Sequence, residues 1–406
     1  MTIRCGITVT LRIEGVAFGG AGVGRHENMA VFVPFTAPGD EVAVTVTAVK
    51  RRYARGELRE IVAASPSRIS PRCPYFTRCG GCDYQHLPYA EQLAIKEGQV
   101  REIFRRLGGF PEPPVAAIIP SPRPFHYRGK GDFCLRRERG KTAVGFLRAG
   151  SHDLVEIESC AIVHETINDT LAALRRSGDG KTRRRGLQKF SLWSHPKSFP
   201  DAPSSEDHQR SSYVRREVLG KTILVPRDGF FQANLCLTGR LVKEVAALCA
   251  LTGRETVVDA YGGSGLFSLF LGPAARRIVG IELQEAAVRC ARLNLEREGL
   301  ANGAFVAGDA AAVLQEMFVR PGKKLDVLLL DPPRNGCGHG VLEAAARLVP
   351  SRIVYVSCNP ATLARDCRFL AASGYRLRYL QPLDMFPQTA HIEIVCLLLR
   401  ADRIVC

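Results

Sequence analysis

Two side chains with complementary chemistry follow neighbouring apolar runs near the end of the chain. Cys358 comes directly after the run RIVYVS (352–357), and Glu393 lies at the start of the run IEIVCLLL (392–399). A third run, LDVLLL (325–330), is followed by Asp331. Each run reads as a buried strand, and open parallel sheets place their chemistry at strand ends. A thiol and a carboxylate at neighbouring strand ends provide a nucleophile and a base, which predicts covalent catalysis.

Cys358 is the candidate nucleophile. By base rate, a cysteine at the end of a strand is an inert buried thiol. However, Cys358 stands between Ser357 and the pair Asn359-Pro360, which favours a turn and an exposed side chain. The next helix is expected to begin at Ala361. Because the positive end of a helix lowers the pKa of a nearby thiol, we expect a thiolate here.

A glycine turn earlier in the chain predicts a nucleotide-like ligand. The strand-like residues 257–259 lead through Tyr261, Gly263 and Gly265 into a helix, and glycine allows a ligand to approach the backbone closely. Glu282 closes the next predicted strand, where a carboxylate can accept hydrogen bonds from both ribose hydroxyls, and Asp309 follows the strand after it.

The glycine turn departs from the dinucleotide fingerprint. Ser268 stands where G-x-G-x-x-G requires its third glycine. This favours S-adenosylmethionine, which has no diphosphate to cradle, over a dinucleotide.

The balance of charge favours a nucleic-acid partner. Lysine and arginine number 56 against 40 aspartate and glutamate, which gives a net charge of +16. Such an excess favours a polyanion, with nucleic acid ahead of an anionic membrane.

A thiolate, a methyl-donor site and a basic surface together suit methylation of a pyrimidine at C5. Addition of the thiolate at C6 makes C5 nucleophilic toward a methyl sulfonium. A base must then remove the C5 proton so that the thiolate can leave, and Glu393 is the candidate for that role.

The chain of 406 residues divides into three predicted domains. Residues 1–63 read as a small β-barrel of the OB type, with a basic run around Tyr53. Residues 64–225 form a β-rich central domain that carries a cysteine cluster, and residues 226–406 alternate strands and helices as a doubly wound α/β domain does. A helix is expected over 88–107 and is a candidate to pack on the catalytic domain.

Two further expectations concern surface and location. Residues 175–215, with a basic run at 181–185 and a polar loop at 200–212, are predicted to form an irregular surface excursion. No apolar run is long enough to span a membrane and the first residues do not resemble a signal peptide, so we expect a cytoplasmic protein. The sequence is silent on oligomeric state, for which monomer is the default.

A separate group of cysteines predicts a metal site. Fourteen cysteines in a chain expected in the cytoplasm favour metal binding or catalysis over disulfides. Cys73, Cys79 and Cys82 form a C-x5-C-x2-C cluster. With a distant fourth thiolate, this spacing suits zinc and an iron–sulfur cluster about equally.

These motifs resemble those of the RNA uracil-5-methyltransferases, over nearly the whole chain. The matching stretches are DPPRNG (331–336), VSCNPATLARD (356–366), DMFPQTAHIE (384–393) and Phe231-Gln232-Ala233-Asn234. Residues 1–63 resemble a TRAM domain, an RNA-binding barrel. Cys73, Cys79, Cys82 and Cys160 match the four [4Fe–4S] ligands of the iron–sulfur branch, which is typified by the 23S rRNA (uracil-5-)-methyltransferases.

The resemblance implies a class I S-adenosylmethionine-dependent methyltransferase fold and a role for each matched residue. Cys358 would be the nucleophile and Glu393 the base. The residues that would bind S-adenosylmethionine are Gln232, Tyr261, Gly263, Gly265, Glu282, Asp309 and Asp331, with Gln232 and Asp331 also near the target uracil. The substrate would be large-subunit rRNA, with tRNA as the alternative, and the target base would have to leave its stack. Methyl transfer needs no electrons, so the cluster would have no redox role in it. It would instead stabilise a small domain.

Two positions require comment. Leu266 stands in the glycine turn where the family often has asparagine, so it cannot supply that amide to the ligand. Cys337 is a second thiol close to the site, and we do not expect it to be catalytic.

Three other functional classes fit the sequence less well. Radical S-adenosylmethionine enzymes use C-x3-C-x2-C rather than the spacing found here. Cytosine-5 methyltransferases carry a cysteine after the proline of the motif at 331–334, which has none. A non-catalytic RNA-binding protein would leave Cys358, Glu282 and Glu393 without a purpose.

Overall fold

The computed structural model describes residues 3–138, 141–176, 187–195, 212–318 and 324–401, which fall into two compact units. The first unit contains the residues described within 1–99, 123–197 and 386–391. The second contains those described within 100–122, 198–385 and 392–406. The chain therefore passes repeatedly from one unit to the other.

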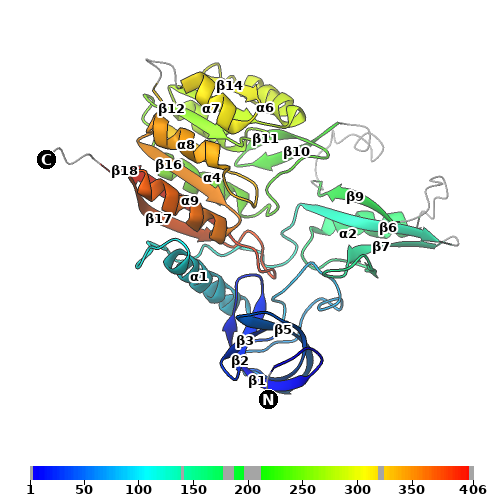
Figure 1. Ribbon diagram of the computed structural model, residues 1–406. Coiled ribbons are helices and arrows are strands. Elements are labelled where there is room, and N and C mark those ends of the chain that lie inside the picture. Colours follow the sequence, from blue (N-terminus) through cyan, green and yellow to red (C-terminus); the bar gives the residue numbers. More distant parts are fainter. Residues whose placement is uncertain (1–2, 139–140, 177–186, 196–211, 319–323, 402–406) are drawn as a thin grey trace. The chain divides into compact units, whose positions relative to one another are not determined.

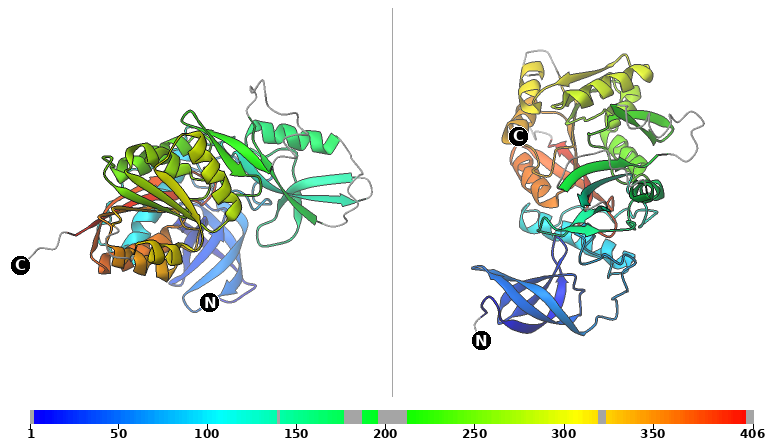
Figure 2. Two further views of the ribbon diagram at one scale, coloured as in Figure 1. Left: turned by 90° about the horizontal axis from the view of Figure 1, so that it is seen from above. Right: turned by 90° about the vertical axis from the view of Figure 1, so that its right-hand side faces the viewer.

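The first unit begins with a closed barrel of five strands (Figure 1, Figure 2). In the barrel order β1-β2-β3-β5-β4, the strands are β1 (Thr8–Val16), β2 (Ala21–His26), β3 (Met29–Pro34), β5 (Tyr53–Ala63) and β4 (Glu41–Val49). Apolar residues alternate along these strands, so that side chains such as Val31, Val33, Val42 and Val44 are fully buried inside the barrel. The predicted β-barrel is confirmed.

An antiparallel sheet of four strands lies further along the first unit. In the order β8-β7-β6-β9, the strands are β8 (Leu154–Glu156), β7 (Lys141–Leu147), β6 (Lys130–Glu138) and β9 (Leu187–Trp193). Helix α2 (Glu165–Arg176) packs on the sheet, and its buried Ile167 and Leu171 share a core with Phe133 of β6.

Strand β9 corrects the prediction for residues 175–215, which expected no regular structure there. The strand pairs with β6, and its Phe190 ring lies 5.9 Å from the ring of Phe133. Apolar side chains at the sheet edge thus order a stretch whose sequence looks mostly polar. The basic run at 181–185 lies outside the described residues, as does the polar loop at 200–212 except for Ser212.

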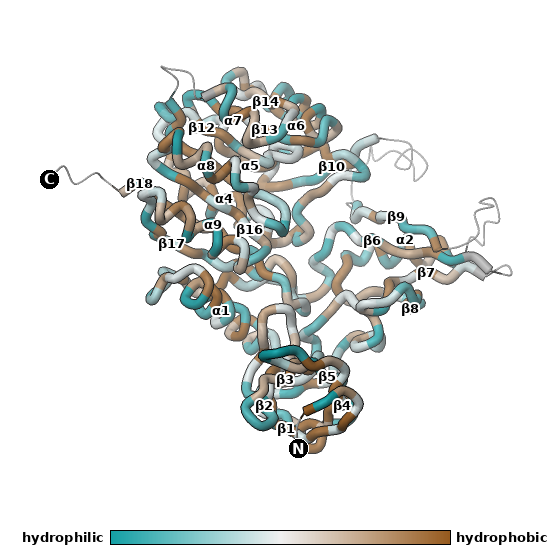
Figure 3. The backbone as a smooth tube through the Cα atoms, in the orientation of Figure 1, coloured by the Kyte–Doolittle hydropathy of each residue, from teal (hydrophilic) through white to brown (hydrophobic). Residues whose placement is uncertain are grey.

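A sheet of seven strands forms the centre of the second unit (Figure 1). In sheet order the strands are β14 (Gly303–Ala307), β13 (Arg277–Glu282), β12 (Thr256–Ala260), β15 (Val327–Leu330), β16 (Arg352–Ser357), β18 (Glu393–Arg400) and β17 (Tyr375–Leu383). The first five are parallel, and β18 runs antiparallel to both of its neighbours. Runs such as VLLL of β15 are buried throughout, and Figure 3 shows these strands as the hydrophobic interior of the unit.

Helices cover the sheet in two groups. One group is α4 (Thr238–Cys249), α5 (Leu266–Leu271) with the short 3-10 helix η1 (Gly272–Ala274), and α6 (Glu285–Arg297). The other is α7 (Ala310–Phe318), α8 (His339–Leu348) and α9 (Pro360–Ala372), packed on a core that includes Leu328, Tyr355 and Leu363. A hairpin of β10 (Tyr213–Val218) and β11 (Lys221–Pro226) packs against α6. The predicted doubly wound α/β sheet is confirmed.

The boundary between the two units falls within helix α1 (Tyr89–Arg106). Its last turns belong to the second unit, where Val100 and Phe104 are fully buried in the core beneath α8 and α9. Its first turns belong to the first unit. None of the described helices is long and apolar enough to cross a membrane.

The segment 386–391 connects β17 to β18 but makes its hydrogen bonds within the first unit. The Gln92 amide donates to Gln388 Oε1 at 3.0 Å and accepts from the Gln388 N–H at 3.1 Å. Tyr127 donates its hydroxyl to the Pro387 carbonyl at 2.9 Å, and Asp83 accepts from the Ala390 N–H at 2.8 Å. Residues far apart in sequence therefore fix the chain just before β18 begins.

Candidate active site

The carboxyl edge of the seven-stranded sheet gathers most of the predicted site residues. The residues that end or follow its parallel strands are Tyr261 (β12), Glu282 (β13), Asp309 (β14), Asp331 (β15) and Cys358 (β16). Because β18 runs the opposite way, its first residue, Glu393, lies at this edge too, where Ser357 pairs with Ile394. The sheet thus places Cys358 and Glu393 at the ends of adjacent strands.

The glycine turn after β12 leaves room for a ligand. Tyr261, Gly263 and Gly265 have positive φ angles of 64°, 53° and 85°, a conformation that glycine adopts without strain. A Cβ atom added at Gly263 would meet nothing within 4 Å. The turn therefore exposes backbone at Gly263.

Glu282 is oriented by this turn. Its Oε2 accepts from the Gly263 N–H at 3.1 Å, and its Oε1 accepts from the Gln284 N–H at 2.8 Å. Each carboxylate oxygen keeps a further lone pair for a ligand hydroxyl. Leu283, next in sequence, is 71% exposed, and the prediction missed it. The available signal was an apolar residue between two polar ones at a strand end.

Asp309 and Gln232 lie in different environments. Asp309 Oδ1 accepts from the N–H groups of Ala311 and Ala312 at 3.0 and 3.1 Å, so it begins α7 as well as facing the edge. Gln232 is buried in the loop after β11. Asn234 shapes that loop, because its Oδ1 accepts from the Leu237 N–H at 3.1 Å.

The Cys358 thiol does not have the lowered pKa that the sequence predicts. Burial raises its pKa to about 11, the Glu393 carboxylate adds to the increase, and the Arg334 guanidinium opposes it. The expected thiolate is therefore wrong for the protein without ligands. Desolvation and neighbouring carboxylates raise the pKa by more than the helix N-terminus lowers it. The Ala361 N–H at that terminus donates to Asn359 Oδ1 at 3.1 Å and so does not point to the thiol.

Two carboxyl groups, the half-buried Asp331 and the buried Glu393, lie at the same edge. Burial and the nearby Asp259 raise the pKa of Asp331 to about 8. Burial and Asp331 raise the pKa of Glu393 well above its ordinary value, and Arg334 lowers it. Arg334 is thus the cation that favours the ionised forms of both Cys358 and Glu393.

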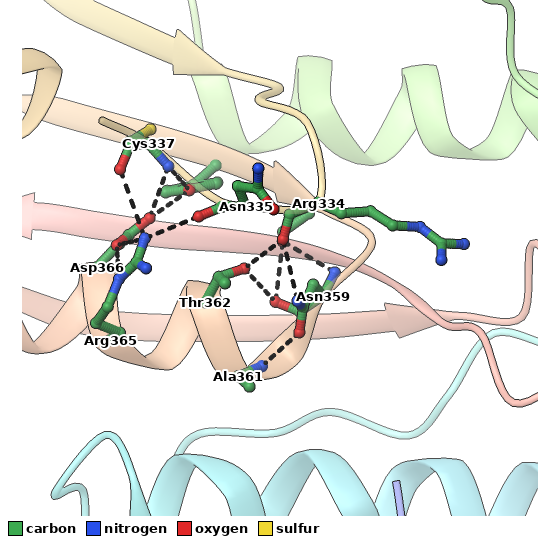
Figure 4. Close-up of polar contacts among 10 residues, drawn as sticks. Arg334, Asn335, Cys337, Asn359, Ala361, Thr362, Arg365 and Asp366 are labelled. Atoms are coloured by element: carbon green, nitrogen blue, oxygen red, sulfur yellow. Dashed lines mark hydrogen bonds and ion pairs between the residues drawn. The ribbon is translucent and has the colours of Figure 1, made fainter. Parts of the chain in front are cut away.

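Arg334 is a further candidate site residue, which the prediction quoted in a motif but gave no role. Its exposed side chain extends away from α9, while its backbone is held against that helix (Figure 4). Its carbonyl accepts from Asn359 Nδ2 at 3.0 Å and from the Thr362 hydroxyl at 3.3 Å. The available signal was an arginine placed directly after a strand-end aspartate and two prolines.

Leu266 and Cys337, the two positions that required comment in the sequence, are both buried. The Cys337 side chain is 4% exposed, and burial raises its pKa to about 12. Leu266 packs in the interior at the first position of α5. A buried thiol with a high pKa is a poor nucleophile.

The four predicted metal-binding cysteines meet in the first unit. Cys73, Cys79, Cys82 and Cys160 all line one cavity of about 240 Å³. Burial, with the neighbouring cysteines, raises the pKa of the Cys79 thiol to about 11. Among the described residues, no three histidine, cysteine or acidic side chains converge closely enough to hold a single metal ion.

Two hydrogen bonds fix the walls of this cavity. The Cys73 N–H donates to Gln85 Oε1 at 2.9 Å, and the Cys160 N–H donates to Asn168 Oδ1 at 2.9 Å. Cysteines from two distant stretches of sequence are therefore held around one space.

The predicted basic run lies on the surface of the barrel. Lys50, Arg51, Arg52, Arg55 and Arg59 are all exposed. Beside them, the Tyr53 ring meets the Phe32 ring edge-on at 5.6 Å. Exposed cations next to aromatic rings are typical of surfaces that bind single-stranded nucleic acid.

Two parts of the chain match known families. Residues 215–401 match the family described as tRNA (Uracil-5-)-methyltransferase, and residues 5–58 match the TRAM domain. An uncharacterized RNA methyltransferase of Thermosynechococcus vestitus is 35% identical over 97% of this chain and 98% of its own. Another, from Gloeobacter violaceus, is 35% identical over 98% of this chain and 97% of its own.

Among solved structures, the chain is similar over most of its length to a tRNA methyltransferase. The tRNA (uracil-54, C5)-methyltransferase of Pyrococcus abyssi, in complex with S-adenosyl-L-homocysteine, covers 96% of this chain and 100% of its own, at 24% identity and a TM-score of 0.69. This likeness establishes a shared fold.

Proposed function

The chain belongs to the RNA methyltransferases that join a tRNA (uracil-5-)-methyltransferase domain to an N-terminal TRAM domain, and from this we propose that it methylates C5 of a uridine in RNA with S-adenosylmethionine as the methyl donor. The observation that carries the proposal is the pairing of β16 with β18, which sets the Cys358 thiol and the Glu393 carboxyl on adjacent strand ends. Those are the two groups that this chemistry requires.

The proposed reaction begins and ends at Cys358. The Cys358 thiol first loses its proton to solvent. The resulting thiolate adds to C6 of the uracil, and the electron pair of the C5–C6 double bond moves toward O4, which makes C5 nucleophilic. S-adenosylmethionine, when bound, supplies the methyl group that C5 accepts. Glu393 then removes the C5 proton, the double bond re-forms, and the thiolate leaves. Arg334 favours the ionised forms of both residues.

Features of the glycine turn support S-adenosylmethionine as the ligand. The open space at Gly263 admits a ligand to the backbone, and the fixed carboxylate of Glu282 suits a ribose. The exposed Leu283 offers an apolar surface for a purine ring. The proposed contacts also include Gln232, Tyr261, Gly265, Asp309 and Asp331.

Glu282→Gln should weaken binding of S-adenosylhomocysteine about 10- to 100-fold. A hydrogen bond to a charged group contributes about 1.5–3 kcal/mol, and glutamine keeps one acceptor oxygen at most. Calorimetric titration would measure the change. The matched control is Glu285→Gln, which alters an exposed carboxylate on α6 whose partner is Arg289. Equal affinities for both variants would contradict the assignment of Glu282.

The four-cysteine cavity supports a [4Fe–4S] cluster as resident cofactor. Four cysteines line one cavity of about 240 Å³, and four thiolates are the ligand set of such a cluster. Cys73, Cys79, Cys82 and Cys160 would hold it through their thiolates. The cluster would stabilise the small four-stranded part of the first unit.

Protein purified without oxygen should contain about four iron and four sulfide per chain. Cys79→Ser should lose most of both, because the thiolate ligand is gone. Cys134→Ser, which changes a buried cysteine of β6 outside the cavity lining, should retain them. About one zinc per chain and no sulfide would instead indicate a zinc site.

Large-subunit rRNA is the proposed substrate, because the spacing of Cys73, Cys79, Cys82 and Cys160 resembles that of the iron–sulfur branch, which is typified by the 23S rRNA enzymes. Transfer RNA is the second candidate, since the matched family and the Pyrococcus abyssi protein both carry tRNA in their descriptions. Nucleoside mass spectrometry on separated rRNA and tRNA, from cells with and without the gene, tests both. Loss of 5-methyluridine from large-subunit rRNA is expected. Loss of 5-methyluridine from tRNA alone would identify tRNA as the substrate. Loss from neither fraction would overturn the proposed function.

A further inference from the structure

Helix α9 carries a buried carboxylate, Asp366, directly beneath the loop 331–337. Building on the proposed function, we propose that Asp366 is a positioning residue that holds this loop on α9 and thereby sets Arg334 against Cys358 and Glu393. The helix that follows the nucleophile and the loop that carries the cation would then act as one rigid piece.

The carboxylate of Asp366 has no exposure to solvent, and its hydrogen-bond partners lie in the loop, in strand β16 and on α9 itself. Oδ2 accepts from the Cys337 N–H at 2.9 Å and from the Tyr355 hydroxyl at 2.7 Å. Oδ1 accepts from Arg365 Nε at 2.8 Å. A buried charge is strongly unfavourable unless it is paired and hydrogen-bonded in this way.

Arg365 extends the hold on the loop. Its Nη2 donates to the Asn335 carbonyl at 3.0 Å, so the ion pair with Asp366 also fixes the middle of the loop (Figure 4). Gly336 shows how close the approach is, since a Cβ atom there would lie 2.6 Å from Asp366 Oδ2. Its φ of 75° also favours glycine.

The first turn of α9 holds the same loop at a second level. Asn359 and Thr362 donate to the Arg334 carbonyl, as described above. Side chains of α9 and of its N-cap residue Asn359 therefore contact the loop at residues 334, 335 and 337, and Tyr355 of β16 adds a second contact at Cys337. The Arg334 side chain extends away from this network (Figure 4).

The sheet contacts this loop at its two ends, where the Asp331 N–H donates to the Ala260 carbonyl of β12 at 3.3 Å and the Cys337 N–H donates to the Tyr355 hydroxyl of β16 at 3.1 Å. The middle of the loop, with Arg334 and Asn335, is held from the side of α9. Asp331 and Cys358 follow strands β15 and β16, whose backbones pair directly. The described strand pairings end at Leu330, and within the loop the Gly336 N–H bonds only to the nearby Pro333 carbonyl, at 2.9 Å. Loss of Asp366 should therefore displace Arg334 while it leaves Cys358 and Glu393 on their strands.

Asp366→Asn tests the proposal in two assays. Single-turnover methylation should slow about 10- to 100-fold, while the Kd values for RNA and S-adenosylhomocysteine stay within about twofold, since neither ligand is proposed to touch Asp366. In the absence of RNA, the pH at which iodoacetamide alkylates Cys358, read from the mass of its peptide, should rise, because the opposing charge of Arg334 is farther away.

The matched control is Asp326→Asn. Asp326 also accepts from a backbone N–H, that of Thr256 at 2.9 Å, and pairs with a cation, Lys324, but it lies at the amino end of β15. This variant should lose comparable stability with unchanged rate and alkylation profile. If Asp366→Asn unfolds, Tyr355→Phe can replace it, because this variant removes one partner of Asp366. It should slow single-turnover methylation about 3- to 10-fold and raise the pH at which Cys358 is alkylated.

The outcomes separate the two proposals. An unshifted alkylation profile in a folded Asp366→Asn protein, or a rate loss no larger than that of Asp326→Asn, would overturn the role of Asp366. Failure of the unaltered protein to methylate uridine would overturn the function instead, and the alkylation assay would still decide on Asp366.

Discussion

Cys358→Ala is expected to reduce formation of 5-methyluridine by on the order of 10⁴-fold or more, because the proposed reaction depends on the Cys358 thiolate to activate C5. Methyl transfer to defined RNA under single-turnover conditions would measure this loss. The variant should also fail to form a covalent complex with RNA that carries 5-fluorouridine at the target, whose fluorine cannot leave as the proton does and so traps the adduct.

Cys337→Ala is the control for this experiment. Its thiol is buried on the loop after β15 and should not carry the adduct, so this variant should still form the trapped complex. Trapping by Cys358→Ala but not by Cys337→Ala would move the nucleophile to Cys337.

Because the pKa of Cys358 is raised, the rate of adduct formation should increase with pH. Below a pKa of about 11, the thiolate fraction of the free protein grows as the pH rises, so the rate of adduct formation should also rise through the neutral range. A rate that stays constant as the pH increases would show that the thiol is already ionised.

Glu393→Gln is expected to lower turnover about 10²- to 10⁴-fold and to accumulate a covalent intermediate on normal RNA. The thiolate can still add and C5 can still accept the methyl group, but glutamine cannot remove the C5 proton. Mass spectrometry of the trapped Cys358 peptide should therefore show uridine with an added methyl group.

Asp331→Asn is the comparison that assigns the base, because Asp331 lies at the same edge as Glu393 and influences its pKa. Asp331→Asn should not accumulate a methylated adduct. Accumulation in this variant, together with free turnover in Glu393→Gln, would show that Asp331 removes the proton.

Sequence patterns that depend on backbone geometry predicted the fold well. The runs before Asp331 and Cys358 and around Glu393 form β15, β16 and β18, because continuous apolar runs bounded by turns are typical of strands buried on both faces. That Asp331, Cys358 and Glu393 lie at one edge followed from the order of the strands, since strand ends in an open sheet share an edge. The glycine turn and Glu282 were likewise visible as a local pattern.

Properties that depend on three-dimensional surroundings were not predictable. The pKa of Cys358 follows from burial and from carboxylates on other strands, which outweigh the local effect of α9. The influence of Arg334 on Glu393 joins residues separated by 59 positions (393 − 334). Strand β9 needed β6 beside it, because its sequence has no strong strand pattern of its own.

The segment 386–391 limits how this protein can be divided or recombined. Its hydrogen-bond partners Asp83, Gln92 and Tyr127 belong to the N-terminal half, yet the segment lies between the last two strands of the catalytic sheet. A fragment cut before β10 would carry these six residues without their partners. In evolution, a graft of a foreign N-terminal half would succeed only if it brought complementary residues. The two halves of the gene are therefore expected to have been inherited together, with substitutions on one side matched by substitutions on the other.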